Sequence, residues 1–241
     1  MSRGNARILM IDHERGAVRA ARRELVANGY DVFTAFRGEK VLETLARYRP
    51  DLVLLDLDLP GMSGLEVCAR IRSQSNLPPI IVFSTRKTEA EKVQALDLGA
   101  DDSISKPFHM PELLARIRVA LRHAVAVPVG TTARITIGPL RVDFERRRVW
   151  VREQEVRLTP TEYALLKVLI TARGQLLTSQ MLLAQVWGAA DERHLHSLHV
   201  YIGHLRRKIE QNPKQPHLLH TLHGVGYWFA DEQGHARPLT S

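Results

Sequence analysis

The sequence has one cysteine and no long apolar run among its 241 residues. Because Cys68 is the only thiol, a disulfide within the chain and a metal site built from several thiolates are both excluded. No stretch of about twenty apolar residues could cross a bilayer, and the first residues lack the pattern of a signal peptide. We therefore expect a cytoplasmic protein that has no membrane partner.

The charge balance differs between the two halves of the chain. The net charge is +8, and after residue 124 there are 15 basic and 10 acidic side chains. The length and the 44% hydrophobic content are enough for two domains, each with its own core. A basic second half suggests a polyanionic partner, although a basic surface is often only solubilising, so a motif must decide.

The first half alternates between buried strands and amphipathic helices. Apolar runs cover residues 8–11, 32–35, 52–55 and 80–83, and helical spacing covers 14–28, 38–47, 63–74 and 88–98, with a fifth unit at 103–121. Strands that are apolar throughout are typical of a parallel sheet with helices on both faces. Residues 1–124 therefore predict an α/β doubly wound domain with a five-stranded parallel sheet.

The pattern changes after residue 124. Residues 125–133 lack apolar periodicity and predict a linker, and residues 233–241 predict a flexible tail. Between them, residues 134–232 predict an α+β domain with short strands on both sides of 138–139 and of 146–148, helices at 160–171, 178–187 and 193–211, and a final hairpin. Thr159 and Glu162 predict a capping box on the first of these helices. Gly224 and Gly226 bound the hairpin turn, a candidate wing that contacts DNA.

Polar residues stand at the ends of four predicted parallel strands. Asp12 and His13 end the first strand, Asp56 the third, Ser84 the fourth and Lys106 the fifth. Because the carboxyl ends of parallel strands share one edge of the sheet, these side chains should meet in one site. The set suits phosphoryl transfer to Asp56, since carboxylates can hold a divalent cation while Lys106 and Ser84 contact the phosphate.

Three motifs make residues 1–123 similar to the receiver domains of two-component systems: residues 55–61 (LDLDLPG), Ser84, and residues 106–108 (KPF). The resemblance implies a flavodoxin/CheY-like fold and phosphorylation of Asp56 by a sensor histidine kinase. It also implies Mg²⁺ as the cofactor, bound by Asp12, Asp56 and the backbone carbonyl of Asp58. We do not expect an enzyme, because a phosphotransferase or hydrolase would need a glycine-rich phosphate loop, which the sequence lacks.

Two residues depart from the receiver pattern. His13 stands where receivers usually have a second acid that binds the metal, and a neutral imidazole offers Mg²⁺ neither charge nor an oxygen. Ser103 stands where relatives of the OmpR type usually have a tyrosine that rotates with the switch hydroxyl. Two alternatives remain open: a phosphorylation switch, or a degenerate receiver that is active without phosphate or is triggered otherwise.

The fourth and fifth predicted helices carry charges of both signs. The residues concerned are Lys92, Asp97, Asp101, Asp102, Glu112, Arg116 and Arg118. Such a surface is often only solvated, but mixed charges can also pair across a two-fold axis. OmpR/PhoB relatives dimerise through this surface, so the resemblance implies a homodimer on activation, with pairs resembling Lys92 to Glu112 and Asp102 to Arg116.

Residues 134–230 resemble the winged helix-turn-helix domain of the OmpR/PhoB family, in residues 158–166 (LTPTEYALL), 186–188 (VWG), 205–208 (LRRK) and 224–227 (GVGY). This resemblance implies binding to double-stranded promoter DNA. The helix expected at 193–209 has one apolar face, so its other face can enter a major groove. The candidate DNA contacts are Arg193, His196, Ser197, His199, Gly203, Arg206, Arg207, Thr221, His223 and Tyr227.

Arg206 and Arg207 are expected to contact phosphates more than bases. The histidines between 194 and 223 do not predict a metal site, because no cysteine or acid completes a tetrahedral set. Family members commonly have arginine at the positions of His196 and His223, so the DNA affinity of this chain should depend on pH.

The resemblance also bears on the genes controlled. Residues 200–206 (VYIGHLR) are similar to the family's regulators of potassium-uptake genes, which suggests control of potassium-transport genes. The family resemblance also implies that the loop at 187–192 touches RNA polymerase. The sequence thus predicts a transcriptional response regulator.

Overall fold

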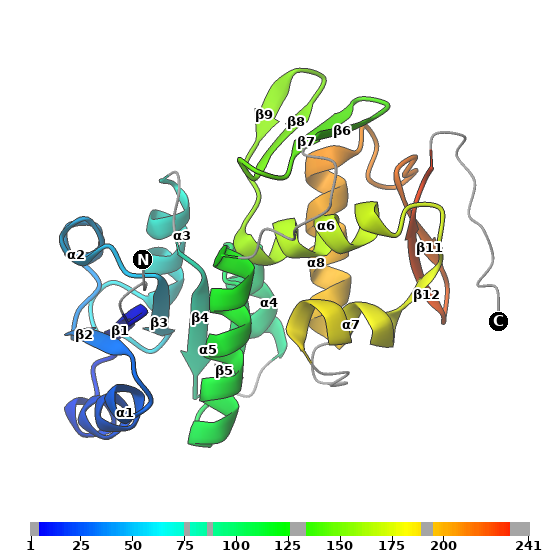
Figure 1. The fold of residues 1–241 in the computed structure, drawn as a ribbon. Coiled ribbons are helices and arrows are strands. Elements are labelled where there is room, and N and C mark those ends of the chain that lie inside the picture. The colour runs from blue at the N-terminus through cyan, green and yellow to red at the C-terminus, as the bar shows by residue number, and fades with distance from the viewer. Residues whose placement is uncertain (1–4, 75–77, 86–88, 126–133, 189–194, 232–241) are drawn as a thin grey trace. The chain divides into compact units, whose positions relative to one another are not determined.

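The computed structural model describes residues 5–74, 78–85, 89–125, 134–188 and 195–231 (Figure 1). Contacts between Cα atoms divide the chain into two compact units, Met1–Ala124 and Val125–Ser241. Of the predicted linker, only Val125 is described, as the last residue of a helix, and the predicted tail at 233–241 lies outside the described residues. No helix within these ranges is long and apolar enough to cross a membrane.

The first unit is a five-stranded parallel sheet with covering helices, as predicted (Figure 1). Its elements are β1 (Arg7–Ile11), α1 (Arg15–Ala27), β2 (Asp31–Ala35), α2 (Val41–Tyr48), β3 (Leu52–Asp56), α3 (Gly64–Arg72), β4 (Ile80–Ser84), α4 (Glu89–Asp97), β5 (Asp102–Ser105) and α5 (Met110–Val125). The strand order is β2-β1-β3-β4-β5, with all neighbours parallel. The four strands expected from apolar runs are confirmed, each longer by a single residue.

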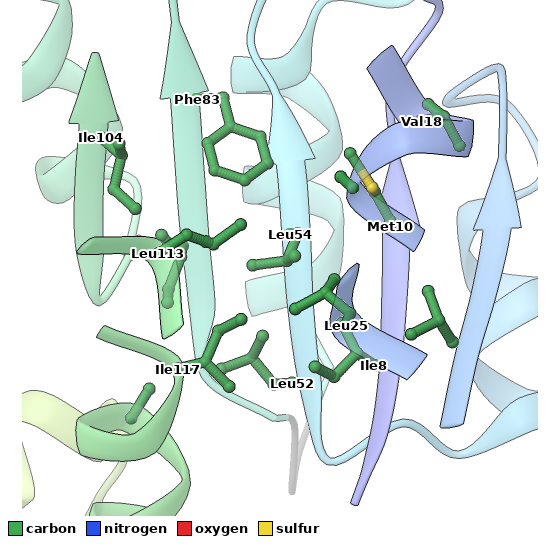
Figure 2. Packing of buried hydrophobic residues seen from close by; sticks show 14 residues of the cluster. Ile8, Met10, Val18, Leu25, Leu52, Leu54, Phe83, Ile104, Leu113 and Ile117 are labelled. Carbon is green, nitrogen blue, oxygen red and sulfur yellow. The ribbon is translucent and has the colours of Figure 1, made fainter. Parts of the chain in front are cut away.

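Alternate strand residues fill a core between one face of this sheet and two helices (Figure 2). The residues labelled there are Ile8, Met10, Leu52, Leu54, Phe83 and Ile104 from the strands and Val18, Leu25, Leu113 and Ile117 from α1 and α5. The opposite face is covered as well, since every residue of β3 and β4 is buried. Each large apolar side chain contributes about 1.5–3 kcal/mol when buried. The core therefore holds the carboxyl ends of the strands in fixed positions.

The second unit contains two antiparallel sheets and intervening helices. Its described elements are β6 (Arg134–Ile137), β7 (Leu140–Asp143), β8 (Arg148–Val151), β9 (Gln154–Val156), α6 (Pro160–Thr171), β10 (Leu177–Thr178), α7 (Ser179–Trp187), α8 (Leu195–Ile209), β11 (Leu219–Leu222) and β12 (Gly226–Phe229). The sheet orders are β6-β7-β8-β9 and β10-β12-β11. The expected helix at 160–171 is confirmed, and α8 ends two residues before the expected boundary.

Local side chains explain where α6 begins. Thr159 accepts a hydrogen bond from the backbone N–H of Glu162 at 3.4 Å, and the Glu162 carboxylate accepts one from the Thr159 N–H at 2.8 Å. The predicted capping box is confirmed. Glu162 does more than cap the helix, because its buried carboxylate also accepts a hydrogen bond from Lys208 of α8 at 2.6 Å.

The two hairpin glycines have different roles. Gly224 has a φ of +75° in the turn, as a tight turn requires. Gly226 was expected to serve the turn as well, but it is the first residue of β12, paired with Thr178 of β10. A Cβ atom at Gly226 would lie 2.0 Å from the Leu177 carbonyl oxygen. The sequence prediction was wrong in this detail: Gly226 allows two strands to approach closely.

Candidate functional site

The predicted strand-end residues meet at the carboxyl edge of the parallel sheet. Asp12 directly follows β1, Asp56 and Ser84 are the last residues of β3 and β4, and Lys106 directly follows β5. Asp12, Asp56 and Ser84 are each at most 2% exposed. The Lys106 Nζ atom lies 2.8 Å from Asp12 Oδ2 and 3.1 Å from Asp56 Oδ1. One ammonium group thus joins two buried carboxylates that are far apart in sequence.

The charge of Lys106 is stabilised by this arrangement. Burial of the ammonium group alone would lower the pKa of Lys106, but its hydrogen bond to Asp12 and the negative charge of Asp56 outweigh that cost. The net result is a pKa of Lys106 above its ordinary value. Lys106 is therefore a permanent cation beside Asp56 at neutral pH.

His13 occupies the other side of the two carboxylates. Its Nδ1 atom lies 2.9 Å from Asp56 Oδ2 and 3.9 Å from Asp12 Oδ1. The Asp12 Oδ1 atom also accepts a hydrogen bond from the Glu14 backbone N–H at 2.8 Å. Each carboxylate therefore directs one oxygen to Lys106 and the other toward His13.

Asp58 lies beside this cluster but turns its side chain elsewhere. Its backbone N–H donates to Asp56 Oδ1 at 3.3 Å, so the Asp58 backbone is adjacent to Asp56. Its carboxylate accepts hydrogen bonds from the Thr85 hydroxyl at 2.6 Å and from the Thr85 N–H at 3.3 Å. Thr85, which the sequence reasoning missed, therefore ties the loop after β3 to the end of β4.

Gly64, at the start of α3, was also missed. A Cβ atom there would lie 2.2 Å from the Asp56 carbonyl oxygen, so only glycine lets α3 begin this close to the end of β3. The Ser63 and Glu66 capping box that starts α3 is the signal that could have drawn attention to this position.

Ser84 has a partner on α4. Its hydroxyl donates to Glu91 Oε2 at 3.3 Å, a contact that the sequence did not indicate. Ser103 pairs with Val82 within the sheet, and its backbone N–H donates to the Asp102 side chain at 2.8 Å. Ser84, rather than Ser103, is therefore the hydroxyl that connects the pocket to α4.

The donor atoms of the pocket can be compared with those that Mg²⁺ requires. Asp12, His13 and Asp56 each offer a ligand atom, and these atoms all lie within 4.8 Å of one another. The two carboxylates match the hard oxygen ligands that Mg²⁺ prefers, whereas the imidazole nitrogen between them does not. The set fits a divalent cation, but it is not the all-oxygen set typical of Mg²⁺.

Several residues proposed for a dimer surface are used within the chain. Asp101 is 2% exposed, forms an ion pair with Arg72 and accepts a hydrogen bond from the Ile80 N–H at 3.0 Å. Arg116 pairs with both Asp102 and Glu112 at 2.8 Å. Asp101 is thus buried, contrary to its predicted place on an interface.

The remaining members of that surface differ in exposure. Asp97 of α4 and Arg118 of α5 are exposed, and Lys92 is partly buried.

A groove of about 600 Å³ lies between α7, α8 and the β11–β12 hairpin in the second unit. Four of the predicted DNA contacts line this groove: His199, Thr221, His223 and Tyr227. Thr178, Ser179 and Gln180 at the start of α7 line it too, and they were missed although the Thr178 cap is readable from sequence. His196 and Arg207 are exposed on α8, Ser197 and Gly203 are partly buried, and Arg193 lies outside the described residues.

Arg206 does not take the position expected of a DNA contact. Its guanidinium donates to the Leu219 carbonyl oxygen at 2.7 and 2.9 Å and to the Thr221 hydroxyl at 2.7 Å. Burial lowers the pKa of Arg206, although Tyr227 and Glu210 oppose that shift. Arg206 therefore joins α8 to β11 through its Nε and Nη2 atoms, a structural role that the sequence did not indicate, and a DNA contact by Arg206 stays a prediction.

The chain matches two protein families, one in each half. Residues 8–118 match the family described as "Response regulator receiver domain", and residues 153–229 match "Transcriptional regulatory protein, C terminal". The chain is 43% identical to the transcriptional regulatory protein KdpE of Mycobacterium tuberculosis and 42% identical to the KDP operon transcriptional regulatory protein KdpE of Escherichia coli. Each alignment covers 92% of this chain and 98% of the relative. A solved structure of a RitR mutant is similar with a TM-score of 0.75 and 26% identity, over 94% of this chain and all of that one.

Proposed function

Because this chain belongs to the OmpR/PhoB family of transcriptional response regulators, we propose that phosphorylation of Asp56 controls how its second unit binds promoter DNA. Members of this family are DNA-binding transcription regulators, and the pairing of a receiver with a DNA-binding domain implies a sensor kinase and promoter DNA as partners. One observation carries the assignment of the phosphoacceptor: Asp56 ends β3 at the sheet edge, 3.1 Å from the Lys106 ammonium group.

The chemistry proposed for Asp56 is nucleophilic. A carboxylate oxygen of Asp56 attacks the phosphorus of a phosphohistidine on the kinase, the P–N bond breaks, and its electron pair returns to the imidazole nitrogen. Lys106 offers a positive charge to one phosphoryl oxygen, and the Ser84 hydroxyl can turn from Glu91 to donate to another. Loss of the Ser84 to Glu91 hydrogen bond would then report the phosphoryl group to α4.

Receiver domains bind Mg²⁺ at their acidic pocket. Here Asp12, Asp56 and the backbone carbonyl of Asp58 are the proposed oxygen ligands, and His13 is adjacent to them. A bound divalent cation offsets the negative charge of the phosphoryl oxygens.

The proposed output is a homodimer that binds promoter DNA and contacts RNA polymerase. The exposed charges of Asp97 and Arg118 support an interface on α4 and α5, whereas the burial of Asp101 removes that residue from it. The groove between α7, α8 and the hairpin supports DNA contacts by His199 and His223, and the exposure of Arg207 on α8 supports a contact by that residue. The expected polymerase contact at 187–192 lies mostly outside the described residues. The similarity to two KdpE regulators supports control of a KDP operon, and so of potassium transport.

A second candidate follows from His13, whose Nδ1 atom lies 2.9 Å from Asp56 Oδ2. If that contact blocks phosphorylation, the chain is a regulator whose receiver is uncoupled from phosphate.

The two candidates are separated by light scattering and DNA-binding anisotropy on the full chain, with and without beryllofluoride, for the wild type and Asp56→Asn. We expect the wild type to dimerise and to bind operator-length DNA more tightly when the phosphoryl analogue is present, and Asp56→Asn to be unresponsive. A wild-type protein that ignores beryllofluoride with every divalent cation tried would contradict phosphorylation control and favour the second candidate.

A further inference from the structure

We infer that the pocket at Asp56 is a mixed nitrogen and oxygen metal site that prefers Mn²⁺ and similar transition-metal ions to Mg²⁺, with His13 as a direct ligand. The inference deepens the proposed function, because it concerns the cation that the phosphoacceptor pocket would hold.

The positions of the donor atoms support this inference. Asp12 Oδ1, Asp56 Oδ2 and His13 Nδ1 form a triangle, with the imidazole nitrogen 2.9 Å from one oxygen and 3.9 Å from the other. Adjacent ligands of an octahedral ion that lie about 2.1 Å from the metal are about 3 Å apart. The separation of His13 from Asp56 is already that of two adjacent ligands, and the separation from Asp12 is within 1 Å of it.

Lys106 makes the opposite side of the cluster unsuitable for a cation. Its ammonium Nζ atom lies 2.8 Å from Asp12 Oδ2 and 3.1 Å from Asp56 Oδ1. A second cation is repelled from those two oxygens. The oxygens that remain are the two facing His13, so a divalent ion held by both carboxylates must also meet the imidazole.

The chemistry of the donors then sets the preference. Mg²⁺ takes oxygen ligands and holds its water strongly, so replacing a carboxylate with a neutral imidazole weakens its binding. Imidazole is a good ligand for first-row transition metals, whose affinity for nitrogen and oxygen sites rises from Mn²⁺ onward. The His13 side chain is 38% exposed, so it has room to move its Nδ1 atom toward a bound metal ion.

The test measures binding of Mn²⁺ and Mg²⁺ to the full-length wild type and to His13→Asp, which restores the acidic pair, by calorimetry and by competition. We expect the ratio of the Mg²⁺ to the Mn²⁺ dissociation constant to fall by about tenfold in His13→Asp. In the wild type, spin-echo modulation of bound Mn²⁺ should report coupling to an imidazole ¹⁴N nucleus, and this coupling should be absent in His13→Asp.

His217→Ala is the matched control, because His217 is an exposed histidine of the second unit that contributes only backbone hydrogen bonds. It should keep both the ratio and the ¹⁴N coupling. His13→Ala should lose the coupling as well, which guards against an effect specific to the new carboxylate.

Absence of ¹⁴N coupling in the wild type, or a metal ratio that is the same in His13→Asp, would overturn the inference and leave His13 as a hydrogen-bond partner of Asp56. These readouts do not depend on phosphorylation. A failed beryllofluoride response with intact ¹⁴N coupling would therefore contradict the proposed function alone.

Discussion

At the scale of single residues, Lys106 is the cation that contacts both buried carboxylates of the Asp56 pocket. Its ammonium group compensates two carboxylates that are 1% and 0% exposed. Removing one partner of a buried ion pair leaves charges that neither water nor protein neutralises.

We expect Lys106→Met to destabilise the first unit by about 3 kcal/mol at pH 7. The raised pKa in the folded state means that Lys106 stabilises the protein fully below its ordinary pKa of 10.5 and loses this contribution as the pH rises through the raised value. The difference between wild type and variant should therefore be constant from about pH 7 to about pH 10 and shrink above that range.

Urea unfolding can assign that loss to the correct unit. All three tryptophans, Trp150, Trp187 and Trp228, belong to the second unit, so tryptophan fluorescence reports that unit while circular dichroism reports both. Lys106→Met should shift the dichroism transition and leave the fluorescence transition in place. A shift of both transitions, or a difference that persists unchanged at high pH, would contradict this account.

At the scale of elements, two adjacent arginines on α8 have separate roles. Arg206 is held by the Leu219 carbonyl oxygen and the Thr221 hydroxyl of β11, whereas Arg207 is exposed. The difference follows from helix geometry, because consecutive residues lie about 100° apart around a helix. Arg206 therefore faces the hairpin, and Arg207 projects from the helix in a different direction.

We expect Arg207→Ala to weaken binding to all DNA sequences alike and to reduce the slope of log K against log salt by about one, as loss of a phosphate contact does. Its stability should stay within about 0.5 kcal/mol of wild type. Arg206→Ala is the matched control: it should lower the fluorescence-detected unfolding midpoint. An Arg206→Ala protein of normal stability that lost the same salt slope would show that Arg206 contacts DNA after all.

At the scale of the whole molecule, the proposed homodimer depends on the charged residues of α4 and α5. The charges on α4 and α5 are divided between internal pairs, such as Arg116 with Asp102, and exposed groups, such as Asp97 and Arg118. Exposed groups are the ones that a second copy of the chain can reach across a two-fold axis.

Arg118→Glu should therefore weaken beryllofluoride-induced dimerisation by roughly fivefold and leave the unfolding of the monomer unchanged. Light scattering against protein concentration gives the dimer constant. Arg70→Glu, the same charge change on the exposed face of α3, serves as the control and should dimerise normally. Equal loss of dimer in both variants would indicate a general charge effect in place of an interface on α4 and α5.

Sequence reasoning succeeded where the signal is local or periodic. Apolar runs located the strands, because strands buried on both faces are apolar throughout, and Thr159 with Glu162 marked the start of α6. It failed where a residue is explained by another that is distant in sequence. Position 226 must be glycine because the Leu177 carbonyl oxygen leaves no room for a Cβ atom. Asp101 is paired with Arg72, which is 29 residues away in the sequence.

The sequence by itself determined the two-part architecture, the family and the set of residues at the sheet edge, because strand ends follow from the hydrophobic pattern and the family follows from its motifs. Only the tertiary structure decided how those residues divide their contacts. Lys106 takes one oxygen of each carboxylate and His13 faces the others, while Arg206 is occupied by β11. The physical reason is that hydrogen bonds and ion pairs depend on distances of about 3 Å, and packing across the fold, not sequence spacing, sets those distances.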